Sequence, residues 1–289
     1  MTLRSAMARI GAQEDLNFLL TNRIPRTMLT RLMGRVSRIE QPLVRDASLA
    51  LWRFFCDVDL TQSEQSRFAS LHEAFIRKLK PGARVVDPDP AVLASPCDAI
   101  VGAHGRVSEG LALQVKGMPY RLDELVGDMA DARAFADGWY VTLRLTAGMY
   151  HRFHAPHDLT VEQVRYISGD TWNVNPIALK RIERLFCRNE RAPIRVRLEH
   201  GGARLMLVPV AAVLVASIRL PWLDAERSVR EGGVGGRAVS ARFAKGAEMG
   251  WFEHGSTIVV LAPRDFALAP GVCEGGTIRM GEPLMRLPD

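Results

Sequence analysis

The segment Ile194-Arg195-Val196-Arg197-Leu198 decides the fold class of most of this chain, because apolar and charged residues alternate along it. Alternation with a period of two residues is typical of a β-strand that buries one face. Similar strand-like segments lie on both sides of it, separated by glycine and proline clusters: Leu111–Val115, Trp139–Leu145, 205–218 and 257–261. Helical patterns do not alternate with these segments, which favours antiparallel pairing. We therefore predict an α+β fold, with a helical N-terminal region followed by a β-rich, mostly antiparallel body.

The first 80 residues have the periodicity of helices instead. Between residues 28 and 39 apolar side chains recur at helical spacing, and Arg31, Arg35 and Arg38 fall on the other side. This pattern is typical of an amphipathic helix in a membrane interface, but a helix that packs on its own domain has the same pattern, so both interpretations stay open. The residue pattern changes from helical to strand-like after Lys80-Pro81-Gly82. We expect a helical, membrane-associating region at 1–80 and a β-rich domain at 81–289.

The charge of the chain narrows the class of partner. The net charge is +6, and residues 1–40 hold seven arginines against three acidic residues, a net of +4. This local excess favours an anionic partner, either a membrane surface or a nucleic acid. No basic sheet with interleaved aromatic residues is visible in the sequence, so we expect no nucleic acid partner.

Hydrophobicity and cysteine usage bear on the cellular location. The 289 residues are 47% hydrophobic, enough for a large core. No apolar run reaches the roughly 18 to 20 residues that a membrane-spanning helix needs, and the N-terminus has no signal-peptide pattern. The four cysteines are far apart and form no CxxC pair. We therefore expect free thiols, a reducing cytosolic environment and at most a peripheral attachment to the membrane.

The run Gly255-Ser256-Thr257 is the strongest candidate for chemistry. A glycine before the serine leaves the preceding carbonyl uncrowded and lets the backbone take strained dihedral angles. A serine hydroxyl is a weak nucleophile and needs an adjacent base, usually a histidine oriented by a carboxylate. His154 in Tyr150-His151-Arg152-Phe153-His154 and Asp98 in Ser95-Pro96-Cys97-Asp98 fit these two roles. Taken alone, however, a serine in such a run is usually a turn residue.

Three histidines, His151, His154 and His157, form an HxxHxxH pattern that would suit a metal site on a helix. Pro156 would break such a helix, and no acidic residue or cysteine close in sequence completes a ligand set. We therefore predict no metal here and interpret His157 as a surface loop residue.

These motifs belong to a longer series that runs in order along the chain. The series comprises 75–84 with Asp87, 95–98, 115–117 with Tyr120, 122–127, 150–156, Val174-Asn175, 189–191, 245–250 with Phe252, and 255–257. In this order and at this spacing the series resembles the phosphatidylserine decarboxylase family. Several motifs in the family's order make a chance similarity very improbable.

The resemblance implies a self-cleaving proenzyme. In the family the chain cuts itself at the Gly-Ser bond, which here lies between Gly255 and Ser256 and would yield chains 1–255 and 256–289. Ser256 would be the nucleophile and then become a covalent pyruvoyl group, with His154 as the base and Asp98 holding the imidazole tautomer. His151 would contact the substrate. The pyruvoyl ketone serves the family as an electron sink, as pyridoxal does in other enzymes.

The resemblance also implies the reaction and its location. The expected activity is decarboxylation of phosphatidylserine to phosphatidylethanolamine in phospholipid biosynthesis, at the cytoplasmic face of the cell membrane. The large and small chains of one precursor would stay together, and a homodimer is left open. Two alternatives also stay open: a pyruvoyl decarboxylase for another amino acid or lipid headgroup, and a relative that binds lipid without processing itself.

Three positions depart from the family pattern. The family usually has an aspartate where this chain has Met149, a glycine where it has Ala99, and a leucine where it has His254. The Met149 change removes whatever local hydrogen bond the aspartate makes, and His254 places a second imidazole next to the cleavage bond. None of the three removes a group that the chemistry requires.

Overall fold

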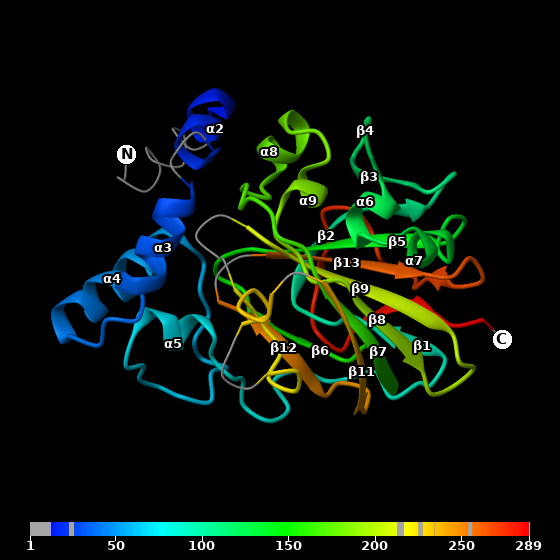
Figure 1. Cartoon of the computed structure of the whole chain (residues 1–289). Helices are drawn as coiled ribbons and strands as arrows, with labels where there is room; N and C mark the ends of the chain where they lie inside the picture. Colours follow the sequence, from blue (N-terminus) through cyan, green and yellow to red (C-terminus); the bar gives the residue numbers. More distant parts are fainter. Residues whose placement is uncertain are drawn as a thin grey trace.

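The computed structural model describes residues 13–22, 26–212, 217–224, 228–233, 235–253 and 256–288. Helices dominate its N-terminal part and lie together at one side of the molecule (Figure 1). They are α2 (Glu14–Asn22), α3 (Arg26–Val36), α4 (Pro42–Phe55) and α5 (Leu71–Phe75). The first strand of the body, β1, begins only at Val92. The predicted α+β fold, with helices first and strands after them, is confirmed.

Local sequence signals set the bounds of these helices. The Gln41 side chain accepts a hydrogen bond from the Val44 N–H, and Pro42 occupies the first turn of α4, where it costs no backbone bond. The Ser70 hydroxyl caps α5 in the same way by accepting from the Glu73 N–H. Trp52 of α4 packs on Phe75 of α5, with ring centroids 5.9 Å apart. These contacts give the helical region a small apolar cluster of its own.

One eight-stranded antiparallel sheet forms the centre of the body. Its order is β11 (Gly235–Phe243), β7 (Leu159–Tyr166), β8 (Ile194–Leu198), β9 (Arg204–Ala211), β13 (Ser256–Ala262), β5 (Trp139–Leu145), β2 (Ala99–Arg106) and β15 (Thr277–Ile278). The sequence of 205–218 is compatible with one or two buried strands. The structure has β9 there and then the separate strand β10 (Ile218–Arg219), and residues 213–216 lie outside the described part.

Smaller sheets surround the central one. They are a sheet of β1 (Val92–Ala94), β16 (Pro283–Arg286) and β14 (Ala267–Leu268), a sheet of β10, β12 (Glu248–Phe252) and β6 (Arg152–His154), and the hairpin of β3 (Leu111–Val115) and β4 (Met118–Arg121). Strand pairs within these sheets are antiparallel. The strand β6 matters for function because it carries His154 from the candidate triad.

The central sheet buries both of its faces. Along β13, Ile258 and Val260 belong to one apolar core, and Val259 and Leu261 belong to the other. The second core also takes in the short helices α6 (Leu122–Val126), α7 (Met129–Arg133), α8 (Pro176–Arg181) and α9 (Leu185–Arg188). The segment 194–198 has the predicted alternation, with its three apolar residues buried and Arg197 exposed. In the described residues, none of the helices has the length and apolar character to cross a membrane.

Candidate active site at the start of β13

Ser256 is the first residue of the central strand β13. It pairs with Leu145 of β5 on one side and with Ala211 of β9 on the other. The residue is completely buried, and its Oγ has no hydrogen-bond partner among the residues that the structure describes. A buried hydroxyl without a partner costs free energy, because the hydroxyl has lost water and gained nothing in return. Such a group is a candidate for chemistry.

Ser256 lines a cavity of about 600 Å³ between the helical region and the end of the sheet. The walls are mostly apolar. The lining residues are Met33, Val36, Ser48, Leu51, Trp52, Phe55, Cys56, Leu71, Phe75, Arg144, Leu145, Thr146, Ala147, Asn173, Val174, Asn175, Ala212 and Ser256. Figure 1 shows α3, α4 and α5 beside the end of the sheet where β13 begins. The size and lining suit one small organic group or one end of a lipid.

His154 lies in β6 of a smaller sheet, is buried, and is not among the described residues that line the cavity; its ring has two partners. Its Nδ1 lies 2.9 Å from the carbonyl oxygen of Gly246, and its Nε2 lies 3.0 Å from the hydroxyl of Tyr150. A carbonyl only accepts, so Nδ1 must carry the proton. Burial lowers the pKa of His154, and the nearby charges of Glu248 and Asp98 oppose this only in part. The imidazole is therefore neutral at pH 7, with the lone pair of a base on Nε2.

Tyr150 is the donor that occupies this lone pair. Burial raises the pKa of Tyr150 well above its ordinary value, so its hydroxyl keeps its proton at physiological pH. For His154 to take a proton from Ser256, the hydrogen bond from the Tyr150 hydroxyl to Nε2 must first break, so that the Ser256 hydroxyl can take its place.

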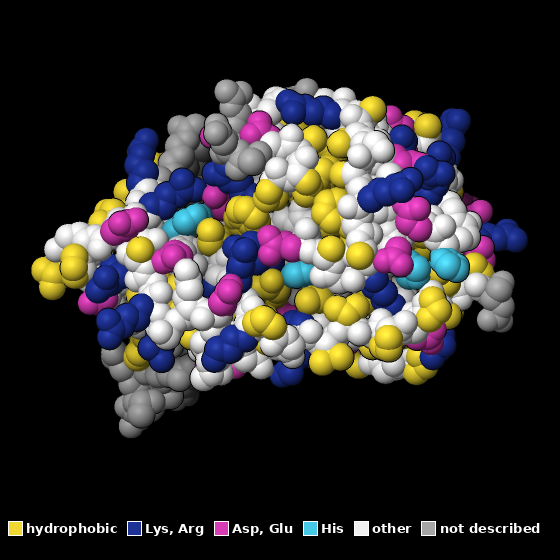
Figure 2. Space-filling view, turned by 90° about the horizontal axis from the view of Figure 1, so that it is seen from below, with side chains coloured by type: hydrophobic (Ala, Val, Ile, Leu, Met, Phe, Trp, Pro, Cys, Tyr) yellow, Lys and Arg dark blue, Asp and Glu magenta, His cyan; other side chains and the backbone are white. Residues whose placement is uncertain are grey.

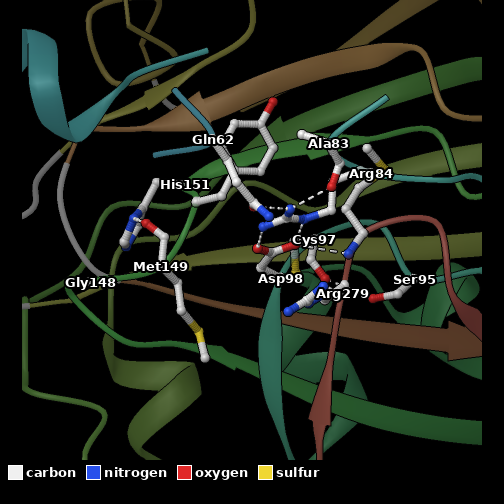
Figure 3. A network of polar contacts seen from close by, with 12 residues as sticks. Gln62, Ala83, Arg84, Ser95, Cys97, Asp98, Gly148, Met149, His151 and Arg279 are labelled. Atoms are coloured by element: carbon white, nitrogen blue, oxygen red, sulfur yellow. Dashed lines mark hydrogen bonds and ion pairs between the residues drawn. The ribbon is translucent and has the colours of Figure 1, made fainter. Parts of the chain in front are cut away.

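Asp98 has a different partner from the one that the sequence suggested. It is buried, and Arg84 holds its carboxylate with two side-chain hydrogen bonds, one of them 2.8 Å from Nε to Oδ1. The backbone N–H of Met280 also donates to Oδ1 at 2.9 Å. Figure 3 shows the Arg84 guanidinium facing the Asp98 carboxylate. The structure therefore does not bring Asp98 into hydrogen-bond contact with His154, and Gly246 sets the tautomer instead.

The Arg84–Asp98 pair allows the role of Asp98 to be tested. We expect Asp98→Asn to slow self-cleavage and Arg84→Gln to slow it comparably, because in this structure Asp98 acts through the pair and not on His154. Both changes leave one partner of a nearly buried pair uncompensated, which costs on the order of 3 kcal/mol of stability. Cleavage half-times from denaturing gels, together with thermal melts, measure both effects. If Asp98→Asn blocked cleavage while Arg84→Gln cleaved normally, Asp98 would act directly on the triad.

His151 is fully buried, next to the N-terminal helices. Its Nδ1 lies 2.9 Å from the carbonyl oxygen of Met149, and its ring packs on Phe75 of α5 with centroids 4.1 Å apart. Phe75 in turn lines the cavity. His151 therefore lies behind the cavity wall, and its expected contact with substrate stays a prediction.

The three histidines of the HxxHxxH pattern do not converge on one point. Nδ1 of His151 and Nδ1 of His154 face different carbonyls, and Nε2 of His157 lies 2.9 Å from the carbonyl oxygen of Pro90. His157 is buried by this packing, so its interpretation as a surface residue is wrong. In the part of the chain that is described, no group of three or more potential ligands could hold a metal ion.

The three departures from the family pattern have different surroundings. At Met149 the backbone carbonyl accepts from His151 and from Arg77, and the sulfur accepts from the Thr146 N–H at 3.4 Å. Ala99 is buried in the first core. His254 lies outside the described residues, and so does Gly255 of the expected cleavage bond.

Glu253 connects the cleavage segment to the helical region. Its carboxylate accepts two hydrogen bonds from Arg38 at 2.9 and 3.0 Å and one from Arg219 at 3.0 Å. Arg38 follows α3 directly, so this ion pair ties the end of that helix to the residue two positions before Gly255. Sequence analysis grouped Arg38 with Arg31 and Arg35 on one solvent-facing side. The structure instead gives Arg38 a partner within the chain.

Sequence reasoning missed the part of the site that the helices and β5 supply. Leu51, Trp52 and Phe55 were recognised only as helix-forming apolar residues, and Arg144 was not singled out. No local signal reveals these residues as cavity lining, because they lie far from Ser256 in sequence. The motif residues Val174 and Asn175, by contrast, do line the cavity.

Comparison with known proteins tests the family resemblance of the motifs. The sequence model of the phosphatidylserine decarboxylase family matches residues 71–286. The chain is 31% identical over 273 residues to the phosphatidylserine decarboxylase proenzyme of Brevibacillus brevis, covering 92% of this chain and 95% of that protein. It is 33% identical over 270 residues to the proenzyme of Bordetella pertussis, covering 90% of each chain. It is also 33% identical over 264 residues to the proenzyme of Myxococcus xanthus, covering 90% of this chain and 94% of that protein. The resemblance of the motifs is thus confirmed, and the chain belongs to the phosphatidylserine decarboxylase family.

Proposed function

We propose that this chain is a proenzyme that cleaves itself between Gly255 and Ser256 and then decarboxylates phosphatidylserine to phosphatidylethanolamine. The observation that supports this best is the position of Ser256, a buried residue with an unpartnered Oγ at the edge of a large apolar cavity. The proenzyme names of the relatives support it independently.

The surroundings of Ser256 fit a pyruvoyl group. Conversion of the serine would break no side-chain hydrogen bond within the described residues, because Oγ makes none there. The cavity next to it leaves room for a substrate amine to approach. When formed, the group would supply a ketone that condenses with the substrate amine and accepts the electron pair released with carbon dioxide.

The cleavage chemistry assigns one role to each residue of the triad. We assign to His154 the removal of the Ser256 hydroxyl proton, since its imidazole is neutral and has its lone pair on Nε2. The Ser256 oxygen then attacks the Gly255 carbonyl carbon, the peptide C–N bond breaks, and the amine nitrogen of residue 256 takes up a proton. Elimination of the resulting ester removes the Cα proton of residue 256 to a base, breaks the Cβ–O bond and frees chain 1–255 as a carboxylate. Water converts the remaining dehydroalanine to the ketone and releases ammonia, leaving chain 256–289.

In the decarboxylation itself, the chain's residues bind, orient and shield the substrate. The apolar walls from α3, α4 and α5 exclude water around Ser256, which strengthens every electrostatic interaction inside the cavity. We assign to His154 the return of a proton to the substrate carbon after carbon dioxide leaves, and to His151 a contact with the headgroup.

We further propose that region 1–80 attaches the protein peripherally to the cytoplasmic face of the membrane and that domain 81–289 carries the chemistry. Large apolar side chains are exposed on the N-terminal helices, among them Met28, Leu32, Leu43, Leu51 and Phe55. Figure 2 shows hydrophobic side chains at the end of the molecule where α4 projects in Figure 1. Because Leu51 and Phe55 also line the cavity, this apolar surface leads directly to the site. A lipid headgroup could thus reach Ser256 while its acyl chains stay in the bilayer.

Decarboxylation by the purified protein tests the proposal. When the protein is added to vesicles that contain phosphatidylserine, carbon dioxide should be released and phosphatidylethanolamine should accumulate. The active protein should consist of two chains. Turnover of a free amino acid or another serine-bearing headgroup, without turnover of phosphatidylserine, would instead favour a related decarboxylase. An uncleaved chain that binds vesicles but releases no carbon dioxide would favour a lipid-binding relative.

Substitution of two exposed leucines that do not line the cavity tests whether the helical region attaches to the membrane. We expect the double change Leu32→Gln and Leu43→Gln to weaken binding to anionic vesicles by about two orders of magnitude. The reason is that each buried leucine side chain contributes roughly 1.5 kcal/mol or more. Vesicle sedimentation measures binding, and decarboxylation of detergent-dispersed lipid should change less than that of vesicle lipid.

A matched control moves the same change to the β3–β4 hairpin of the body. Leu111 and Leu113 are also exposed, at 39% and 38%, and their change to Gln should leave vesicle binding as it was. Equal binding by the Leu32/Leu43 variant and the parent would make the helical region a packing element only.

A further inference from the structure

Arg144 is a cationic side chain placed at the same cavity as Ser256. It precedes Leu145 in β5 and pairs with Thr257 of β13, one residue beyond the candidate nucleophile. Leu143 and Leu145 pack in the first core, so strand alternation directs Arg144 to the other face of the sheet. Arg144 and Ser256 both line the cavity at the strand ends, together with Asn173 and Asn175.

Arg144 has no ion-pair or hydrogen-bond partner among the described residues, which sets it apart from other arginines around the site. Arg84 pairs with Asp98, and Arg152 pairs with Glu248 at 2.6 Å. Arg77, which is buried, donates to the Gly148 carbonyl at 3.0 Å. For Arg144 burial lowers the pKa, and no neighbouring anion offsets this. A partly buried guanidinium without an anion is unfavourable, so an anion that enters the cavity would be bound there.

The side chain of Asn175, another polar residue of the cavity, is already engaged within the chain. Asn175 uses its side-chain oxygen to cap α8 and its amide to donate to Asn17. Within the described lining of the cavity, Arg144 is the only residue with a positive charge. The rigid fork of a guanidinium also matches the oxygens of a phosphate or a carboxylate.

The proposed substrate offers two anions, and the chemistry distinguishes between them. The carboxylate loses its charge as carbon dioxide leaves, so an arginine bound to it would stabilise the ground state and slow the reaction. The phosphodiester keeps its charge throughout and lies only a few bonds from the reacting amine. We propose that Arg144 binds the phosphodiester of the lipid headgroup and selects for phosphate-bearing substrates. This inference rests on the proposed function and names the group that recognises its substrate.

Kinetics of the processed enzyme test the assignment. Arg144→Gln should raise KM for detergent-dispersed phosphatidylserine roughly 10- to 100-fold with little change in kcat, because a contact that is equal in ground and transition states affects binding alone. Arg144→Lys should recover part of the loss. O-Methylserine, which keeps the free amine and carboxylate but lacks a phosphate, should be turned over equally by parent and variant. A matched control is Arg106→Gln on β2, since Arg106 stacks on Trp139 at the other end of β5 and should leave KM unchanged.

Several outcomes would overturn the inference. A fall in kcat at constant KM would place Arg144 at the reacting carboxylate. An equal rise in KM for both substrates would show that Arg144 does not recognise the phosphate. Failure of Arg144→Gln to cleave itself would assign the arginine to maturation instead. If the parent did not decarboxylate lipid at all, the proposed function would fail separately. Binding of glycerophosphoserine to the parent and to Arg144→Gln, measured by calorimetry, would then still decide the role of Arg144.

Discussion

Replacing Ser256 with alanine is expected to leave the protein as one uncleaved chain of 289 residues with no decarboxylase activity. The change removes the oxygen that attacks Gly255 and also the precursor of the ketone, so both stages fail together. In hydrolytic enzymes, loss of the nucleophilic serine costs about 10⁶ in kcat, and here no alternative nucleophile adjoins the cleavage bond in the right position. Since Oγ has no partner within the described structure, the variant should fold as stably as the parent.

Intact mass measures this outcome. The parent should give two chains, 1–255 and 256–289, with the smaller one blocked at its N-terminus by a pyruvoyl group. Thr257→Val is a matched control, because Thr257 is the next residue of β13, is equally buried, and also has an Oγ1 without a partner in the described part of the chain. This control should cleave normally. Two chains from Ser256→Ala, or an active parent that stays intact, would show the cleavage assignment to be wrong.

Removing the imidazole of His154 should have the second largest effect. We expect His154→Ala to slow self-cleavage by about 10² to 10⁴, the usual contribution of a general base. His104→Gln is the control, because His104 lies in β2, outside the cavity lining, and contacts the carbonyl of Gly102. If His154→Ala still matures, His254 next to the cleavage bond is the alternative base, and the double variant of His154 and His254 then decides between them.

The pH dependence of cleavage reports the same residue. Burial lowers the pKa of His154 from its ordinary value of 6.5, so the imidazole stays neutral when the pH falls to that value. The base is active when neutral, so the cleavage rate should fall to half of its plateau value only below pH 6.5. The rate of appearance of the small chain in purified precursor measures this profile. A half-point above pH 6.5 would mean that His154 is not the base, or that its pKa is not lowered in the folded precursor.

The sequence was sufficient for the features that depend on neighbouring residues. The alternation over 194–198 predicted a half-buried strand, and the helical spacing over 28–39 predicted a helix, because both patterns arise from the repeat of a single element. The sequence also predicts the chemistry of Gly255-Ser256, because nucleophile and scissile bond are adjacent in the chain, and this stays a prediction. The ordered motifs predicted the family, which the comparisons confirmed.

Only the tertiary structure determined which side chains from distant segments contact one another. The cavity joins Met33 of α3 with Ser256 of β13, and the helical region meets the cleavage segment through Arg38 and Glu253. The sequence assigned Asp98 to His154, whereas the folded chain gives Asp98 to Arg84 and the His154 Nδ1 proton to the Gly246 carbonyl. A hydrogen bond needs two groups within about 3 Å of each other, and which carbonyl or guanidinium comes that close depends on how the sheets and helices pack. Residue types in order predict which chemistry a chain has available, and packing decides which groups carry it out.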